Sequence, residues 1–501
     1  MDNLKGKRVL IFQQRGWGKT IGRFLAKKLS EEEAVLAALT FKKSTDELIR
    51  NQPGVKYELI IENDAIMSDP AAYLAGDVFS FEEICGELGI DSIWHLAYTL
   101  RNHVKSYREK YYYSFRQNVS DEGIELFIKA VYKYMKVFFS EFKPDVIIAP
   151  NFVALPHIIF NLYAKKNKIP MFAITSWAVK GFWQFTYNYQ DSEGPFFKRL
   201  DDLNNQKEKS SNQNKARSFI ETFRAEYGKV SAETPKKLGF RHFLKKELSP
   251  YYQCFKWWMG KRPVDYVKAT GITVDYRPPK ILLRDHYMNK YQKWAASRFQ
   301  FYPLEKVGKC VYFPLQFQPE ANIDVIAPNF SNQIETARQV AMSLPGDYTL
   351  VVKEHPEMVG LRPMSYWEKV ARTPNVKFID YRTPTVQIFK KADLIVSPNG
   401  TTIGEAAFFC KPVIQLGNLG TTMKLPNVFK HTDFTALPRK IKEVLSINLR
   451  TEDYEGKLEN YVAAIFDAGS SFNYGDIWSK GAGDKEELWR IYKRELDRIF
   501  S

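Results

Sequence analysis

The sequence contains little cysteine, and its cysteines are far apart. Cys85, Cys254, Cys310 and Cys410 are the 4 cysteines of the 501 residues, and they form no Cys-x-x-Cys pair. We therefore expect neither a disulfide framework nor a zinc site. This cysteine usage favours a reducing cytoplasm.

Long hydrophobic runs are also missing. No segment reaches the roughly 18 consecutive apolar residues that a membrane-spanning helix needs. The first residues lead into a short apolar run, Val9 to Phe12, which is too short for the hydrophobic region of a signal peptide. The sequence therefore predicts a cytoplasmic protein without a membrane span.

Acidic residues are fewer than basic ones. The chain has 73 Lys and Arg against 57 Asp and Glu, a formal net charge of +16. An excess of this sign suits an anionic partner such as a nucleic acid, an acidic membrane surface or a negatively charged sugar nucleotide. The rest of the composition, 45% hydrophobic and 26% charged, is that of an ordinary globular chain long enough for two domains.

Strand-like and helix-like segments alternate between Lys309 and Gly417. Helical patterns at 332–344 and 403–409 separate strand patterns, which lie at 310–313, 348–352, 376–379, 394–396 and 412–416. Alternation of this kind predicts a parallel, doubly wound sheet. Ligands of such sheets bind outside the carboxyl ends of the strands.

Three polar loops leave these strand ends, and their chemistry points to a phosphate. The segment Ser397 to Thr402 ends at a helix start, where backbone N–H groups and the helix dipole favour an anion. Lys353 and His355 supply cations or donors, and Glu405 is placed to accept a hydrogen bond from a ribose. Thr401 and Thr402 have the alternative interpretation of plain helix caps.

The order of these motifs resembles a known group of enzymes. Phe313 to Glu320, then Lys353-Glu354-His355-Pro356, then Gly400-Thr401-Thr402 with Glu405 are similar to the nucleotide-binding half of bacterial surface-polysaccharide glycosyltransferases of the GT-B fold. The His-Pro pair resembles that of capsular Kdo transferases and of bacterial sialyl- and polysialyltransferases. The similarity covers about 110 residues, and the order and spacing of the motifs make it specific.

The resemblance implies an α/β protein of the GT-B fold, with two Rossmann-like domains facing a cleft. We expect an acceptor-side domain at 1–300 with a helical basic and aromatic insertion at about 200–270, a nucleotide-sugar domain at 301–480, and a C-terminal helix at 481–501 that crosses back to the first domain. The implied activity is metal-independent transfer of a sugar to a surface polysaccharide or lipid-linked glycan. The His-Pro pair favours CMP-Kdo or another CMP-linked ulosonic acid as donor.

Other functions stay open. GT-B folds more often use UDP-sugars, nonhydrolysing UDP-sugar epimerases share the two-domain fold, and a noncatalytic protein that holds an anionic polymer would also suit the charge.

The resemblance places the donor contacts on residues of the three loops. They are Gln316, Gln318, Glu320, Lys353, Glu354, His355, Pro356, Ser397, Asn399, Gly400, Thr401, Thr402 and Glu405. No cofactor other than the CMP- or UDP-linked donor, no metal and no nucleic acid is expected.

The first half of the chain begins with a strand pattern at 9–12 and a glycine-bearing turn, and two more strand patterns follow at 34–39 and 56–61. Arg15, Gly16, Gly18 and Lys19 imitate the end of a phosphate-binding P-loop, but its first glycine would fall at Gln13, so an ATPase is not indicated. In GT-B proteins the corresponding loop faces the cleft. We therefore treat these four residues as possible cleft contacts, with a tight strand-to-helix turn as the alternative.

A second strand–helix–strand unit runs from Pro144 to Thr175. Its strand patterns at 145–149 and 171–175 enclose a helical segment at 154–166, and Asn151 follows the first strand. Asn151 is a further candidate contact for the acceptor. His157 lies within the helical segment and is expected to have an ordinary structural partner.

The catalytic base is predicted upstream of this unit. Ser120-Asp121-Glu122-Gly123 resembles the acidic-acidic-glycine motif of bacterial polysialyltransferases, whose carboxylate is taken as the general base. A sugar hydroxyl must lose its proton as it attacks, and a carboxylate in a cleft can accept it. We name Asp121 and Glu122, with His355, as catalytic candidates; a helix N-cap with acids in the first turn is the alternative.

Within the insertion, basic residues alternate with aromatic ones. They are Arg241, Lys245, Lys246, Phe255, Lys256, Trp257, Trp258, Lys261 and Arg262. Such residues can lie on an anionic membrane surface, where lipid-linked acceptors reside, or they can pack an inserted helix onto the core. Peripheral contact with the inner face of the cytoplasmic membrane is therefore a prediction.

Overall fold

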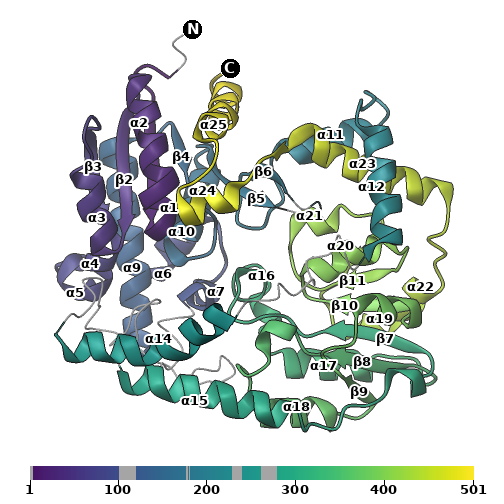
Figure 1. The fold of residues 1–501 in the computed structure, drawn as a ribbon. Helices are drawn as coiled ribbons and strands as arrows, with labels where there is room; N and C mark the ends of the chain where they lie inside the picture. Colours follow the sequence, from purple (N-terminus) through teal and green to yellow (C-terminus); the bar gives the residue numbers. More distant parts are fainter. Residues whose placement is uncertain (1–3, 101–119, 177–178, 180, 228–239, 261–278) are drawn as a thin grey trace.

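The computed structural model describes residues 4–100, 120–176, 179, 181–227, 240–260 and 279–501. These residues form two α/β domains, each built on its own sheet, and a pair of long helices that lies along one side of both (Figure 1). Lys261 and Arg262, which were predicted as part of the basic insertion, lie outside the described residues.

The first sheet is parallel except at one edge. Its strands, in spatial order, are β13 (Ser470–Ser471), β6 (Phe182–Thr186), β5 (Met171–Ser176), β4 (Val146–Ile148), β1 (Arg8–Gln14), β2 (Val35–Phe41) and β3 (Tyr57–Glu62). Strands β1, β2, β4 and β5 are almost wholly buried because helices cover both faces, which explains their continuous apolar runs. The chain first places β2 on one side of β1, and later it places β4 on the other side of β1.

The second sheet repeats this topology. Its strands, in spatial order, are β12 (Val428–Lys430), β11 (Val413–Gln415), β10 (Leu394–Ser397), β7 (Cys310–Pro314), β8 (Thr349–Lys353) and β9 (Val376–Ile379), and all their pairings are parallel. Both sheets therefore have the doubly wound Rossmann order, which confirms the predicted GT-B class. In each sheet the order reverses beside the first strand, between β1 and β4 and between β7 and β10.

Helices surround the two sheets. In the first half of the chain they are α1 (Arg15–Trp17), the π-helical turn η1 (Gly18–Gly22), α2 (Arg23–Glu31), α3 (Lys43–Arg50), α4 (Asn63–Ser68), α5 (Pro70–Leu74), α6 (Phe81–Leu88), α7 (Trp94–Ala97), η2 (Tyr98–Leu100), α9 (Asp121–Val137), η3 (Phe138–Phe142) and α10 (Leu155–Lys166). Between the sheets come α11 (Pro195–Asn204), α12 (Gln213–Ala225), α14 (Phe240–Trp258) and α15 (Pro279–Ala296). The 3-10 turn η4 (Leu304–Lys306) comes just before β7. After β7 the helices are α16 (Ala321–Asp324), η5 (Pro328–Phe330), α17 (Gln333–Met342), η6 (Pro356–Met358), α18 (Met364–Ala371), α19 (Thr385–Lys391), α20 (Thr401–Phe408), α21 (Gly420–Met423), α22 (Leu437–Leu445), α23 (Glu452–Ala468), α24 (Tyr474–Lys480) and α25 (Lys485–Phe500). No helix in these described ranges is long and apolar enough to cross a membrane.

The carboxyl end of the second sheet faces the first domain. Val325 and Ile326, in the connection after β7, and Leu419, after β11, belong to the same apolar cluster as Leu100 and Phe152 of the first domain. In addition, the backbone N–H of Gly420 donates to the carbonyl of Gln190 at 2.7 Å. The loops at the carboxyl ends of the strands therefore meet across the boundary between the domains.

The chain returns to the first domain at its C-terminal end. Leu488, Ile491, Tyr492 and Leu496 of α25 are buried in the apolar cluster that covers one face of the first sheet. In α24, the hydroxyl of Tyr474 accepts a 2.7 Å hydrogen bond from the indole N–H of Trp17. Two helices from the end of the chain thus complete the core of its beginning (Figure 1).

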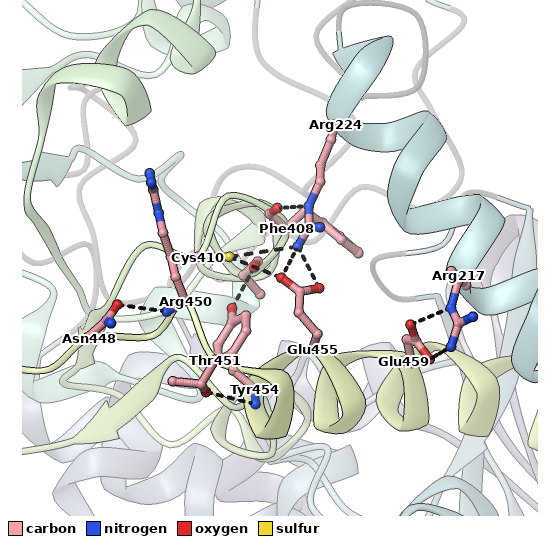
Figure 2. A network of polar contacts seen from close by, with 11 residues as sticks. Arg217, Arg224, Phe408, Cys410, Asn448, Arg450, Thr451, Tyr454, Glu455 and Glu459 are labelled. Carbon is pink, nitrogen blue, oxygen red and sulfur yellow. Dashed lines mark hydrogen bonds and ion pairs between the residues drawn. The ribbon is translucent and has the colours of Figure 1, made fainter.

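Helices α11 and α12 pack with the second sheet, although they fall within the predicted first domain. Their apolar side chains share a cluster with α20 and α23. Figure 2 shows how Arg224 and Arg217 of α12 reach Glu455 and Glu459 of α23. Arg224 donates to both oxygens of Glu455, at 2.8 and 3.0 Å, and also to the carbonyl of Phe408 at 2.6 Å. Helices α11 and α12 are thus attached to the second sheet, whereas β13, from within the range predicted for the second domain, pairs with β6 of the first sheet.

Candidate functional site

Two of the three predicted donor loops meet at the point where the strand order of the second sheet reverses. Gln316, after β7, donates through its amide to the hydroxyl of Ser397 at 3.2 Å. Gly400, after β10, lies so close that a Cβ there would be 2.4 Å from the side-chain oxygen of Gln316. The φ angle of Gly400 is +118°, which a residue with a side chain rarely adopts. A glycine is therefore required where the two loops touch.

The third loop is joined to the other two by a buried ion pair. Arg362 donates to Glu354 at 2.6 Å, and the side chains of the two residues are 1% and 0% exposed. Arg362 also donates to the backbone carbonyl of Gln316 at 2.8 Å. The other carboxylate oxygen of Glu354 accepts from the indole of Trp367 at 2.8 Å. Glu354 thus acts as a scaffold residue: it fixes the loop after β8 to the loop after β7.

His355 is held by this scaffold. Its backbone N–H donates to Glu354 at 2.7 Å, and its ring lies 5.8 Å from the ring of Phe317, centroid to centroid. Its Nδ1 accepts a 3.2 Å hydrogen bond from the backbone N–H of Glu357. The residue between them, Pro356, is the first residue of η6. Burial lowers the pKa of His355 below its usual 6.5, although Glu354 opposes the shift. A neutral ring that accepts at Nδ1 carries its proton on Nε2, so His355 presents one N–H donor.

Several predicted contact residues point into the scaffold of the second domain. Lys353 donates to the carbonyl of Thr383 at 3.1 Å and to the hydroxyl of Thr385 at 2.9 Å. Gln318 donates to Asp324 at 2.8 Å. Asn399 donates to the carbonyl of Asn322 at 2.7 Å and is fully buried. These hydrogen bonds fix the shape of the loops, and direct contact of the three side chains with a donor stays a prediction.

The N-terminus of α20 is more accessible. Thr401 is exposed and Thr402 half-buried, and neither makes a side-chain cap of this helix. One turn later, Glu405 accepts a 2.6 Å hydrogen bond from the hydroxyl of Tyr227. Glu320 is half-buried at the start of α16, also without a side-chain cap. Backbone N–H groups and two hydroxyls therefore remain at this helix start, in agreement with an anion site.

The glycine-bearing turn of the first domain has mainly a packing role. A Cβ on Gly18 would lie 2.8 Å from the carbonyl carbon of Gln13, so only glycine lets η1 press against β1. Gly16 is exposed and faces Trp478 of α24. Lys19 donates to the hydroxyl of Ser44 at 3.1 Å. Burial lowers the pKa of Arg15, while nearby Asp64 opposes that shift.

Two side-chain oxygens remain open at the strand-order reversal of the first sheet. The amide oxygens of Gln14, at the end of β1, and of Asn151, after β4, are buried and have no hydrogen-bond partner among the described residues. Both loops end at the edge where ligands of doubly wound sheets bind. Asn151 stays a predicted cleft contact, and Gln14, which the sequence prediction did not include, lies at the same sheet edge. His157 is buried inside the domain, where its ring stacks on Phe41.

Asp121 and Glu122 lie in the first turn of α9. Ser120 caps this helix, and its hydroxyl accepts the backbone N–H of Gly123 at 3.2 Å. Both acidic side chains are exposed. The hydrogen bond from Ser120 lowers the pKa of Glu122, which makes its carboxylate a weaker base. The capping geometry is thus present, and a catalytic role for these carboxylates stays a prediction.

No motif in the sequence indicated the residues that support the site most. Arg362 and Trp367 are as buried as the sheet strands, yet neither lies in a motif or in a strand pattern. Gln333 was also missed: its side chain accepts the backbone N–H of Gln316 at 2.6 Å. Within the described ranges, no group of three or more His, Cys, Asp or Glu residues is arranged to hold a metal ion.

Neither a protein-family model nor a curated protein matches this sequence. Several solved structures are similar to it. KpsC, a beta Kdo 2,7 transferase of Thermosulfurimonas dismutans, has 11% identity and a TM-score of 0.35 over 75% of this chain and 97% of that chain. The UDP-GlcNAc 2-epimerase of Methanocaldococcus jannaschii has 14% identity and a TM-score of 0.25 over 92% of this chain and 99% of that chain. The Neisseria meningitidis UDP-GlcNAc 2-epimerase has 14% identity and a TM-score of 0.26 over 92% and 98%. At these values the similarity concerns the fold and assigns no role to any residue.

Proposed function

We propose that this protein is a glycosyltransferase that moves a sugar from a nucleotide donor to a glycan or lipid-linked glycan acceptor at the inner face of the cytoplasmic membrane. One observation carries the proposal. Gln316 is bonded both to Ser397, beside Gly400, and to Arg362, which holds Glu354 and thereby His355. An imidazole N–H donor and a helix start are thus fixed at one sheet edge, an arrangement suited to a nucleotide phosphate.

The reaction we propose is a direct displacement at the anomeric carbon of the donor. The acceptor oxygen forms a bond to that carbon, the bond from carbon to phosphate oxygen breaks, and the nucleotide leaves with the electron pair. Asp121 or Glu122 takes the proton of the acceptor hydroxyl. His355 and the N-terminus of α20 stabilise the negative charge that develops on the departing phosphate, the role that usually contributes most to the rate.

The proposed donor is a CMP-linked ulosonic acid such as Kdo. Support for this choice comes from His355-Pro356 and its resemblance to the pair of Kdo and sialyl transferases. A neutral His355 is sufficient for the proposed contact, because an Nε2–H donor can bind a phosphate oxygen without carrying a charge.

Product analysis with and without an acceptor tests the proposal. The purified protein is incubated with CMP-Kdo and, separately, with UDP-GlcNAc, each with and without a surface-glycan acceptor. We expect sugar transfer from CMP-Kdo only when the acceptor is present, and we expect His355→Ala to reduce the rate at least tenfold. Conversion of UDP-GlcNAc without any acceptor would show an epimerase instead. Transfer from a UDP-sugar would keep the enzyme class and change the donor.

The two candidate bases need separate variants. We expect Asp121→Asn or Glu122→Gln to lower kcat by about a hundredfold with little change in KM, because a general base acts in the transition state. Ser120→Ala serves as the matched control, since it removes the helix cap and the hydrogen bond to Glu122 but keeps both carboxylates. If neither acidic variant changes kcat more than Ser120→Ala does, the base lies elsewhere.

A further inference from the structure

Large apolar side chains are exposed along one face of α14. They are Leu244, Leu248, Tyr251, Tyr252, Phe255, Trp258 and, just after the helix, Met259, with exposures between 43% and 81%. Their spacing of three and four residues places all of them on one side of the helix. A helix that packed this face against the core would bury it, so no described part of the chain covers the apolar side of this amphipathic helix.

Helix α15 extends the same surface. Tyr287, Tyr291 and Trp294 follow at the same helical spacing and are each more than half exposed. The hydroxyls of Tyr251 and Tyr287 are 2.6 Å apart, which joins the two faces. Of the fifteen large hydrophobic side chains that are exposed in the described ranges, these ten lie on this pair of helices, which we call the aromatic hairpin. Figure 1 shows the two helices side by side along one side of the molecule.

The two helices of the aromatic hairpin are rich in basic residues. Helices α14 and α15 together contain eight Lys and Arg residues against only two acids, Glu247 and Asp285. Both acids are paired with cations, Glu247 with Lys290 and Asp285 with Arg284. At the border of the apolar face, the ammonium of Lys256 lies 4.8 Å above the ring of Tyr252. The positive charge is therefore available to an external partner.

The aromatic hairpin is attached to the candidate donor site. The side chain of Asn289 in α15 donates to the carbonyl of Gly360 at 2.8 Å. Two residues further, Arg362 forms the ion pair with Glu354 that holds the His355 loop. A Cβ on Gly360 would lie 2.8 Å from the amide of Asn289, so the contact depends on glycine. The aromatic hairpin is thus linked to the His355 loop through Gly360 and Arg362.

We propose that the aromatic hairpin docks this protein on an anionic lipid bilayer, with its Tyr, Phe and Trp side chains in the headgroup region and its Lys and Arg side chains on the lipid phosphates. Charge complementarity supports a membrane as the occupant, because an apolar helix face bordered by cations is the pattern of interfacial helices. The location of the acceptor at that membrane rests on the proposed function, whereas lipid binding itself does not.

Vesicle sedimentation tests the proposal. The full-length protein is mixed with vesicles of phosphatidylcholine alone or with one third phosphatidylglycerol, at low and high salt. We expect binding to the anionic vesicles that weakens with salt, and at least a tenfold weaker interaction with neutral vesicles. Phe255→Glu/Trp258→Glu is expected to lower the affinity for anionic vesicles at least tenfold. Val78→Glu/Met342→Glu, which adds the same charge at exposed apolar positions elsewhere, leaves binding unchanged.

Each other outcome overturns the proposal. Failure of the wild-type protein to sediment with anionic vesicles at low salt excludes lipid docking, as does equal binding by the hairpin variant. A dimer that is seen by analytical ultracentrifugation and lost in the hairpin variant, without lipid binding, would assign the surface to a second copy. Nucleotide-induced thermal stabilisation is measured on the same samples, so that loss of lipid binding can be separated from failure of the proposed function.

Discussion

At the scale of single residues, the stability of the site depends on Arg362. Replacing Arg362 with Met leaves the fully buried Glu354 carboxylate without its charge partner. Breaking a buried pair in this way usually costs about 3–5 kcal/mol, so we expect a loss of that size in the free energy of unfolding. Urea denaturation measures it.

The matched control for this prediction is an exposed ion pair of the same domain. Arg382 pairs with Asp380 at 2.6 Å, but its side chain is 66% exposed. We expect Arg382→Met to cost less than about 1 kcal/mol. The double variant Glu354→Leu/Arg362→Met removes both buried charges and should recover part of the loss. An equal effect of the two single variants would contradict the assigned scaffold role.

The pKa of His355 links stability to pH. Burial lowers this pKa below 6.5 in the folded state, so between the lowered value and 6.5 the unfolded chain binds more protons. Stability is therefore lost as the pH falls through this window. We expect the wild type to lose more unfolding free energy than His355→Gln between about pH 7.5 and 5.5, measured by urea denaturation. The same loss in both proteins would contradict a neutral His355.

The site residues show what the sequence can predict at this scale. The motifs predicted that Gln316, Ser397 and Gly400 follow strands of one sheet, and the structure brings these three residues into contact because parallel strands end at a common edge. The motifs did not distinguish side chains that face the carboxyl-end edge of the sheet from side chains that face the interior of the domain. Lys353 and Glu354 stand beside His355 in one motif, yet their partners lie inside the domain, and those partners come from segments without any motif.

At the scale of elements, the packing of η1 on β1 leads to a contrast between two glycines. We expect Gly18→Ala to cost about 1–3 kcal/mol, because its Cβ would lie 2.8 Å from the Gln13 backbone and the strand or the helix must move. Gly456 in α23 has no atom within 4 Å of such a Cβ. There, Ala should stabilise the helix by about 0.5–1 kcal/mol. In thermal denaturation, we expect Gly18→Ala to lower the melting temperature and Gly456→Ala to raise it. An unchanged melting temperature of Gly18→Ala would contradict the close contact.

The central strands and one edge strand of each sheet were predictable, and the strands at the opposite edge of each sheet were not. Every strand pattern that the sequence showed corresponds to an observed strand, because buried parallel strands consist of continuous apolar runs. The strands missed were β6, β12 and β13, which are short or lie toward sheet edges. Helix α23 was also missed, although it contributes many side chains to the core of the second domain.

At the scale of the whole molecule, the last helix of the chain belongs to the first domain. Helix α25 buries Leu488, Ile491, Tyr492 and Leu496 against the first sheet. At about 1.5–3 kcal/mol for each such side chain, these four account for roughly 6–12 kcal/mol, comparable to the stability of a typical domain. We therefore expect a chain that ends at Asp484 to lose the cooperative unfolding of its first domain, as measured by calorimetry.

The control for this truncation is a change on the other side of the same helix. Arg490 is 72% exposed, and Arg490→Ala is expected to change the unfolding free energy by less than about 0.5 kcal/mol. A truncated protein that unfolds like the full chain would contradict the structural role of α25. Local sequence patterns predicted this helix, but which sheet it covers depends on contacts nearly 500 residues apart and cannot be read from periodicity.

The most direct test of the account is nucleotide-induced stabilisation. The melting temperature of the protein is measured with CMP, CDP, UDP, UDP-GlcNAc and GDP, for the wild type, His355→Ala and the neighbouring control Glu357→Ala. A ligand at about 100 times its Kd stabilises the native state by about 2.7 kcal/mol, which is readily detected. We predict stabilisation by CMP that is kept in Glu357→Ala and lost in His355→Ala. Stabilisation by no nucleotide, or by CMP equally in His355→Ala, would contradict a nucleotide-sugar site at this edge of the second sheet.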